Sequence, residues 1–282
     1  MELRPWIRRS LWLGLCVSGM WRLPLQAQTY QDCVKQALDA MAADSLSKAE
    51  ELFRQAMRLE PAQRSNALLF NHIGRIQERR GEYAEALESY TRGLNQSPYT
   101  LGILLNRAAL YLRLNRLDKA LADYSGVLDL NAEHVEALLN RAYVYDRQRL
   151  YKNARADYEK VLGMFPSHDR AMLGLAIVND KDNRPQEAME MMERFVQVYP
   201  ERAEGFAVKG GMELERKQYE LARFDLDKAV RLDAGNPDMY VSRATYFQAV
   251  NERDAARADL EAALRLGADP QEIASLLLEL KR

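Results

Sequence analysis

Residues 70–98 read FNHIGRIQERRGEYAEALESYTRGLNQSP, and this stretch decides the fold. Its Ala86 belongs to a series in which the first interval is 37 residues and the next five are 34 residues each: Ala49, Ala86, Ala120, Ala154, Ala188, Ala222 and Ala256. A strict period in this range predicts one supersecondary structure that is copied and stacked. Because stacked copies build extended surfaces rather than closed pockets, we expect a protein without catalytic activity.

The period defines a common frame in which the recurring alanine is position 20. The repeats then cover residues 30–63, 67–100, 101–134, 135–168, 169–202, 203–236 and 237–270. Position 8 is always Ala or Gly, position 24 is always large and apolar or aromatic, and position 32 is often Pro. Small residues let two helices approach closely, and proline cannot continue a helix interior. We therefore expect helices at positions 1–14 and 18–31 of every repeat, joined by a short turn.

The stretch 70–98 carries this pattern with Gly74, Tyr83, Ala86, Tyr90 and Pro98. The frame resembles the tetratricopeptide repeat family, and it covers residues 28–270. The resemblance implies an all-α, right-handed α-solenoid of seven helix-turn-helix repeats. The sequence departs from the family pattern at position 4, where the common tryptophan is absent. It departs again at position 27 of the fifth repeat, where Phe195 replaces a small residue.

The C-terminal segment 271–282 is expected to form a capping helix for the last repeat. Asp269 suits the N-cap position and Pro270 the first helical position. An apolar stripe follows at Ile273, Leu276, Leu277 and Leu280. End repeats of solenoids need such a cover because their apolar face has no further neighbour.

Two positions of the frame vary together. Position 7 is basic in four repeats, and position 23 is Asp in the same four: Arg107 with Asp123, Arg141 with Asp157, Lys209 with Asp225, and Arg243 with Asp259. The other repeats carry Gln36 with Leu52, Ile73 with Ser89, and Leu175 with Met191. A partly buried charge needs its partner, so we expect an ion pair between the two helices of each repeat. The alternative is a ladder of basic residues that faces a ligand.

The first 27 residues lie outside the repeat and are expected to be a secretory signal peptide. Arg4, Arg8 and Arg9 form a basic region, the apolar run from Leu11 to Trp21 follows, and Ala27 offers a small residue at a cleavage site. Two alternatives stay open, an uncleaved membrane anchor and lipidation of Cys16. Cleavage would leave Cys33 as the single cysteine, at an apolar helix position. We expect export, with the periplasm as the destination, although secretion or membrane anchoring stays open.

No stretch of the sequence indicates catalysis or a cofactor. The chain has 40 basic and 41 acidic residues, so no basic surplus points to nucleic acid. The three histidines, His72, His134 and His168, have no second ligand at helical spacing, so no metal site is expected. Neither a phosphate-binding glycine loop nor a metalloprotease motif occurs.

The resemblance implies a peptide-binding groove along the first helices of the repeats, mainly at positions 2, 5, 9 and 12. Positions 5 and 9 are largely apolar in repeats three to six, whereas positions 2 and 12 are often acidic. An apolar floor with an acidic rim fits a peptide with basic flanks. The candidate groove residues are Asn71, Arg75, Leu105, Leu139, Tyr143, Leu173 and Ile177. The alternative is that these apolar residues pack between helices and bind nothing.

Together these features predict a scaffold or assembly factor of the cell envelope that holds a peptide or protein segment. A self-associating or membrane-tethered structural protein is the main alternative, and the membrane enters only if the N-terminal segment stays uncleaved. A glycan-binding accessory protein is a further alternative. It is poorly supported, because only Tyr143 adds an aromatic ring to the predicted groove.

Overall fold

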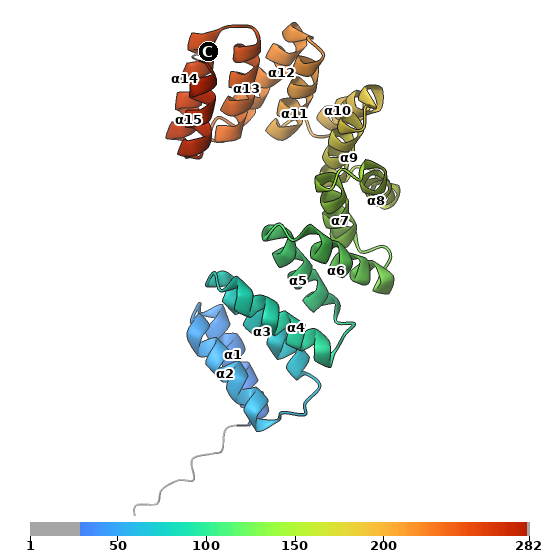
Figure 1. Ribbon diagram of the computed structural model, residues 1–282, viewed down its shortest axis with the longest axis vertical. Helices are drawn as coiled ribbons and strands as arrows, with labels where there is room; N and C mark the ends of the chain where they lie inside the picture. The colour runs from blue at the N-terminus through green and yellow to red at the C-terminus, as the bar shows by residue number, and fades with distance from the viewer. Residues whose placement is uncertain (1–28, 281–282) are drawn as a thin grey trace, which may run out of the picture. The chain divides into compact units, whose positions relative to one another are not determined.

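The computed structural model describes residues 29–280, which form fifteen α-helices and no strand (Figure 1). The signal-peptide prediction for residues 1–27 lies outside the described residues. The described residues divide into two compact parts, 29–63 and 64–280, which are described separately. The first contains α1 (Tyr30–Ala42) and α2 (Leu46–Leu59). The second contains α3 (Asn66–Arg79), α4 (Tyr83–Gln96), α5 (Leu101–Arg113), α6 (Leu117–Leu130), α7 (Val135–Arg147), α8 (Tyr151–Met164), α9 (Asp169–Lys181), α10 (Pro185–Val198), α11 (Ala203–Glu215), α12 (Tyr219–Leu232), α13 (Pro237–Ala249), α14 (Arg253–Arg265) and α15 (Pro270–Glu279).

Consecutive helices pack in pairs, and the all-α solenoid fold is confirmed. Within each pair we call the first helix A and the second helix B. Helix A ends at position 13 of the frame and helix B begins at position 17, so each boundary lies one residue earlier than expected. In the second part, successive A helices also contact one another, from α3 with α5 to α11 with α13. None of the described helices is long and apolar enough to cross a bilayer.

The small and large positions of the frame form the core. All seven alanines at position 20 are fully buried. The large residue at position 24 is buried in every repeat: Phe53, Tyr90, Tyr124, Tyr158, Met192, Leu226 and Leu260. Gly74 shows why position 8 must be small, because a Cβ there would lie 2.5 Å from the Tyr90 ring. In the first part, Cys33 is fully buried, as are the core residues Ala37 and Phe53. Burial raises the pKa of the Cys33 thiol.

The turn between helices A and B depends on one left-handed residue at position 15. Its φ angle lies between 55° and 78° in every repeat: Asp44, Gly81, Asn115, Arg149, Asn183, Lys217 and Asn251. This conformation lets the next amide donate back across the helix end, as Leu150 N does to Tyr145 O at 2.8 Å. Asn, Asp and Gly tolerate this backbone region well, whereas Arg149 and Lys217 adopt it at a cost in free energy.

Position 27 of one repeat packs near position 3 of the next, and the two side chains compensate each other in size. These junction pairs in the second part are Gly93/Ile103, Val127/Ala137, Val161/Ala171, Phe195/Gly205 and Ala229/Met239. A Cβ on Gly93 would lie 2.8 Å from Ile103 Cδ1, and a Cβ on Gly205 would collide with the Phe195 ring. The unusual Phe195 is therefore fully buried, and the glycine of the following repeat makes room for it.

The predicted ion pairs between positions 7 and 23 are present in all four repeats. Arg107, Arg141 and Arg243 each hold their aspartate with two hydrogen bonds of 2.8 Å, and Lys209 Nζ lies 2.5 Å from Asp225 Oδ2. The three arginines also contact helix B of the preceding repeat. Their third nitrogen donates to position 25 of the preceding repeat: Thr91, Ser125 and Asp227. The pairs are structural, so they do not form a ladder that faces a ligand.

The last described helix, α15, packs against α14. The Asp269 side chain accepts a hydrogen bond from Gln271 N at 2.9 Å, and Pro270 is the first helical residue. Ile273 and Leu280 are buried, whereas Leu276 and Leu277 are half-buried against the same cluster. The expected range 271–282 extends past this helix, and residues 281–282 lie outside the described part of the chain.

Candidate functional site

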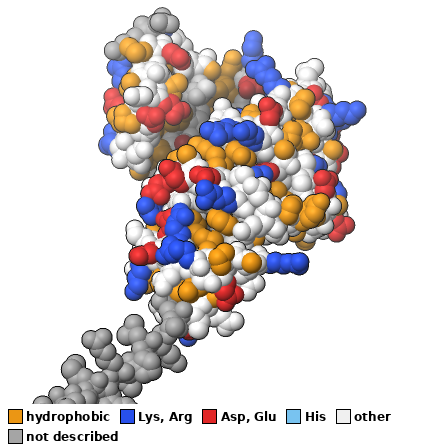
Figure 2. All heavy atoms as spheres, turned by 60° about the horizontal axis from the view of Figure 1, so that its bottom comes forward, with side chains coloured by type: hydrophobic (Ala, Val, Ile, Leu, Met, Phe, Trp, Pro, Cys, Tyr) orange, Lys and Arg blue, Asp and Glu red, His pale blue; other side chains and the backbone are white. Residues whose placement is uncertain are grey.

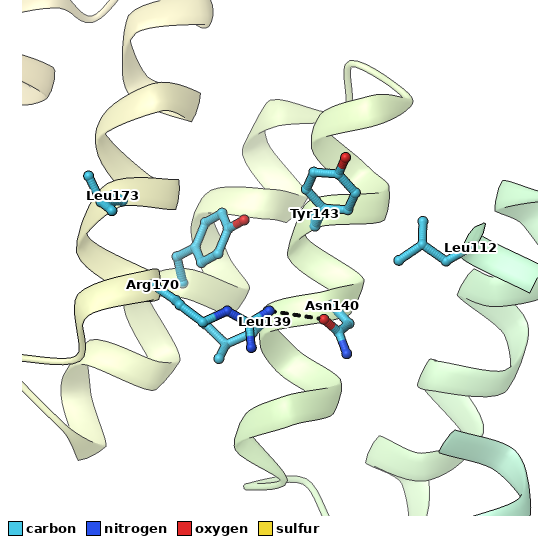
Figure 3. Close-up of a pocket in the computed structure, with 7 residues that line it drawn as sticks. Leu112, Leu139, Asn140, Tyr143, Arg170 and Leu173 are labelled. Carbon is cyan, nitrogen blue, oxygen red and sulfur yellow. Dashed lines mark hydrogen bonds between the residues drawn. The ribbon is translucent and has the colours of Figure 1, made fainter. Parts of the chain in front are cut away.

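A pocket of about 400 Å³ opens on the surface formed by the A helices of the second part, which we call the A-helix wall. Figure 3 shows its lining: Leu112 from α5, Leu139, Asn140 and Tyr143 from α7, Tyr158 from α8, and Arg170 and Leu173 from α9. Leucine side chains and tyrosine rings supply the apolar surface, and one guanidinium and one amide supply the polar groups. Because helices from three successive repeats contribute, the pocket exists only when these repeats are stacked.

Three of the seven candidate groove residues line this pocket. They are Leu139, Tyr143 and Leu173, of which Tyr143 is 42% exposed and Leu139 only 3% exposed. Leu139 therefore belongs mainly to the core and forms the pocket floor. Leu105 and Ile177 do not line the pocket and lie half-buried against the neighbouring hydrophobic clusters. For these two residues the structure favours the alternative of packing between helices.

The guanidinium of Arg170 is the cation of the pocket. One of its nitrogens donates to Asn140 Oδ1 at 3.2 Å, which is the dashed line in Figure 3. Within residues 29–280, Arg170 forms no ion pair. Its side chain is exposed, so it can turn further donors toward a bound carboxylate or carbonyl oxygen.

Tyr143 and Tyr158 form the aromatic sides of the pocket. The Arg147 guanidinium lies over the Tyr143 ring at 5.9 Å and also donates to Asn115, which holds this ring in place. Burial raises the pKa of the Tyr158 phenol well above its usual range, and the charge of Asp146 raises it further. The hydroxyl therefore stays protonated. Gly174 lets the phenol approach, because a Cβ at this position would collide with it.

Two of the three acids expected to form a rim at position 12 are neutralised by ion pairs in the structure. Asp146 pairs with Lys181 at 2.7 Å and Asp180 with Arg216 at 2.5 Å, and each cation comes from the following A helix. Glu78 accepts a hydrogen bond from the Tyr90 hydroxyl. At position 2, Glu204 pairs with Arg202 at 3.1 Å, whereas Glu136 remains exposed. The prediction of an acidic rim for basic peptide flanks is therefore wrong for Asp146 and Asp180, two of the three acids at position 12.

A second pocket of about 260 Å³ lies between α3 and α5, and it is basic. Its lining comprises Arg75, Glu78, Arg79, Asn106 and Arg113. The candidate residue Arg75 belongs here and is exposed. The other candidate from this repeat, Asn71, lies next to this lining, where its Oδ1 accepts from Asn106 Nδ2 at 2.8 Å. The two pockets are thus neighbours along one wall of consecutive A helices.

Charges of both signs are interspersed with hydrophobic side chains on the face drawn in Figure 2, in keeping with a formal net charge of −1. Within the described residues, no group of three His, Cys, Asp or Glu side chains could hold a metal ion. The lining of the first pocket contains no His, Cys, Asp or Glu. The pocket instead combines an apolar surface with the hydrogen-bonding side chains of Asn140 and Arg170, which suits ligand binding rather than proton transfer.

Sequence reasoning missed four residues of the first pocket: Leu112, Asn140, Tyr158 and Arg170. Leu112 and Arg170 occupy positions 12 and 2 of the frame, so they lie on the expected stripe. Arg170 is moreover the one basic residue at position 2 among repeats two to seven, a signal that could have singled it out. Tyr158 comes from a B helix, which the stripe does not include.

Comparison with known proteins shows matches across most of the described chain. The family model for the tetratricopeptide repeat matches residues 34–99, 105–169, 145–200 and 173–237. A crystal structure of a tetratricopeptide repeat protein from Parabacteroides merdae is 30% identical, with a TM-score of 0.80, and the match covers 90% of this chain and 100% of that one. MamA from Desulfovibrio magneticus shares the fold at 23% identity and a TM-score of 0.56, over 60% of this chain and 95% of that one.

A shorter match occurs with a mouse protein, RNA polymerase II-associated protein 3 from Mus musculus. It is 34% identical over 80 residues, which are 28% of this chain. The matched stretch covers only 12% of the mouse protein, so the likeness concerns a small part of that chain.

Proposed function

Because the chain belongs to the tetratricopeptide repeat family, we propose that it is a scaffold without catalytic activity that holds a segment of another protein on its A-helix wall. The pocket between α5, α7, α8 and α9 is the anchor of this proposal. It takes one apolar side chain of the partner against Leu112, Leu139 and Leu173. Arg170 then binds an oxygen atom of the same segment.

The observation that carries this proposal is that the exposed Tyr143 ring and Arg170, which forms no ion pair within residues 29–280, lie beside an apolar floor at Leu139. Complete burial of a Leu or Phe side chain supplies about 1.5–3 kcal/mol. Tyrosine and arginine are the residue types that contribute most strongly to protein–protein binding when they become buried there. Both occur at this pocket, and Tyr143 is held in place by Arg147 before any partner arrives. A preorganised site loses less entropy on binding.

We further propose that the protein works in the cell envelope, in the periplasm. Support comes from the N-terminal pattern of a basic region, an apolar run and a small residue at Ala27. Mass spectrometry of the protein purified from its native cells tests this step. A mature chain that starts at Gln28 supports export, and an intact N-terminus favours the membrane-tethered alternative.

Site-specific photo-crosslinking in the native cells tests the binding site. A benzophenone amino acid at position 143 is expected to capture a defined partner. The same group at Tyr99, a tyrosine that is 77% exposed and absent from the pocket lining, serves as the matched control. Arg170→Ala should weaken capture at position 143. Circular dichroism confirms that each variant is folded.

Identical captured proteins at positions 143 and 99 would overturn the assignment of this pocket, and so would capture at 143 that Arg170→Ala leaves unchanged. Leu139 is a poor test residue, because a change at a side chain that is 3% exposed disturbs the core as well as the pocket.

A further inference from the structure

Resting on the proposed function, we infer that the segment held on the A-helix wall carries acidic side chains, which bind the arginines between α3 and α5. These acids precede or follow, within the same segment, the apolar residue that fills the first pocket. The partner is thus an acidic and apolar stretch of protein. This charge is opposite to that of the basic flanks that the sequence pattern predicts.

The cations that carry this inference are Arg75 and Arg113. Neither forms an ion pair with any residue in the range 29–280, although both line the same pocket. Arg113 donates to the Tyr83 hydroxyl at 2.7 Å and lies 4.7 Å from the centre of that ring, so its guanidinium is held in position. Guanidinium groups bind carboxylates through paired hydrogen bonds, which are stronger than neutral ones.

The acids on the same wall are mostly occupied. Glu78, the one carboxylate of the second pocket, accepts from Tyr90. Asp146 and Asp180 are paired with Lys181 and Arg216. Glu136, at position 2 of α7, is exposed and forms no ion pair within residues 29–280. Glu78 also keeps its negative charge, because the Tyr90 hydroxyl that donates to it is neutral. Against these two acids stand three arginines without an ion pair within residues 29–280, namely Arg75, Arg113 and Arg170, so the free charge of the wall from α3 to α9 is positive.

The separation of the two pockets sets the spacing in the partner. Packed helices lie about 8–10 Å apart, and the pockets are two A-helix steps apart, so their centres are separated by roughly 16–20 Å. An extended chain advances about 3.3 Å per residue. The acidic residues should therefore lie about five or six residues from the apolar anchor.

Fluorescence anisotropy with synthetic peptides tests the inference on the full chain. The probe is a fluorescein-labelled, amidated peptide of about twelve residues, with two glutamates and a Leu-Phe pair at the spacing above, made in both orders. Matched probes carry Gln or Lys in place of the two glutamates. Amidation removes the terminal carboxylate, so only side-chain acids are tested. We expect the glutamate probe to bind about tenfold more tightly than the Gln probe, with the difference lost at high salt.

Two variants separate this inference from the proposed function. Arg75→Gln/Arg113→Gln should abolish the preference for glutamate without weakening the Gln probe, and Arg231→Gln, an exposed arginine of α12, is the control. Tyr143→Ala should weaken both probes. Equal affinities for the glutamate and Gln probes, tighter binding of the Lys probe, or no binding of the glutamate probe at millimolar concentration would each overturn the inference. If Tyr143→Ala leaves every probe unaffected, the proposed function fails as well.

Discussion

The ion pair between Arg141 and Asp157 allows a quantitative test of how the repeats are held together. Arg141 holds Asp157 with two hydrogen bonds of 2.8 Å, donates to Ser125 at 3.3 Å, and lies 5.7 Å from the centre of the Tyr145 ring. Its side chain is 22% exposed and that of Asp157 is 8% exposed. Removal of one partner from a fully buried pair costs about 3–5 kcal/mol.

Because water reaches part of the arginine, we expect Arg141→Leu to cost less, about 2–3 kcal/mol, with Asp157 left unpaired. Asp157→Met should cost about 1–2 kcal/mol, since the longer arginine can turn toward solvent. The fifth repeat supplies the design of the double variant, because Leu175 and Met191 occupy the same two positions. Arg141→Leu/Asp157→Met should therefore lie within about 1 kcal/mol of the wild type.

Urea unfolding of the full chain, followed by circular dichroism, measures the three free energies. The matched control is Arg92→Leu/Glu88→Leu, which removes an exposed pair on α4 at 56% and 62% exposure and should change little. The reasoning is refuted if the cost of the double variant at positions 141 and 157 equals the sum of the two single costs, because the charges would then act independently.

Three further predictions concern stability in the same assay. Arg149→Gly should stabilise by about 0.5–1 kcal/mol, because glycine relieves the left-handed φ of 61° at some cost in chain entropy, and Gly81→Ala should destabilise by about 1 kcal/mol. If neither substitution changes the free energy of unfolding, the left-handed residue at position 15 does not limit stability. Gly205→Ala should cost about 1–3 kcal/mol through collision with Phe195, and Phe195→Val/Gly205→Ala, which copies Val161 and Ala171, should recover much of it. If the double variant is no more stable than Gly205→Ala alone, the side-chain sizes at positions 195 and 205 do not compensate each other. Finally, Glu213→Gln should stabilise at neutral pH. Burial and the charge of Asp225 raise the pKa of Glu213 although Lys209 opposes the shift, so the stabilising contribution of Glu213 is present at low pH and lost as pH rises through the folded pKa. The gain should vanish as pH falls toward about 4.3, the unfolded value, and a gain independent of pH would contradict the assignment.

The fold and the pairing of charges within a repeat could be predicted because the chain contains its own copies. Seven examples of one frame separate the positions that must be small from those that vary. They also show that Arg141 and Asp157 change together with their counterparts. The same comparison of repeats could also have predicted the left-handed residue of the turn, since Asn or Gly occupies position 15 in four repeats.

The pocket could be predicted only in part, because it depends on how neighbouring repeats are placed. Tyr158 enters the lining from a B helix, through space that Gly174 leaves open in the next repeat. Two of the acids at position 12 are neutralised by cations 35 and 36 residues further along, in Lys181 and Arg216. Such contacts join different positions of different repeats, so the comparison of equal positions could not reveal them.

The junction pairs make the repeats similar in outline but not freely exchangeable. If the fourth repeat were followed by the sixth, Val161 would face Gly205 and leave a void. If the fifth were followed by the third, Phe195 would meet Ile103 in space already filled. Overpacking of a core typically costs about 1–3 kcal/mol, and a void costs more as its volume grows. The two Val/Ala junctions are interchangeable, whereas Gly93/Ile103, Phe195/Gly205 and Ala229/Met239 each favour one neighbour. These three junctions therefore oppose the assembly of near-identical repeats in the wrong order, within one molecule or between two.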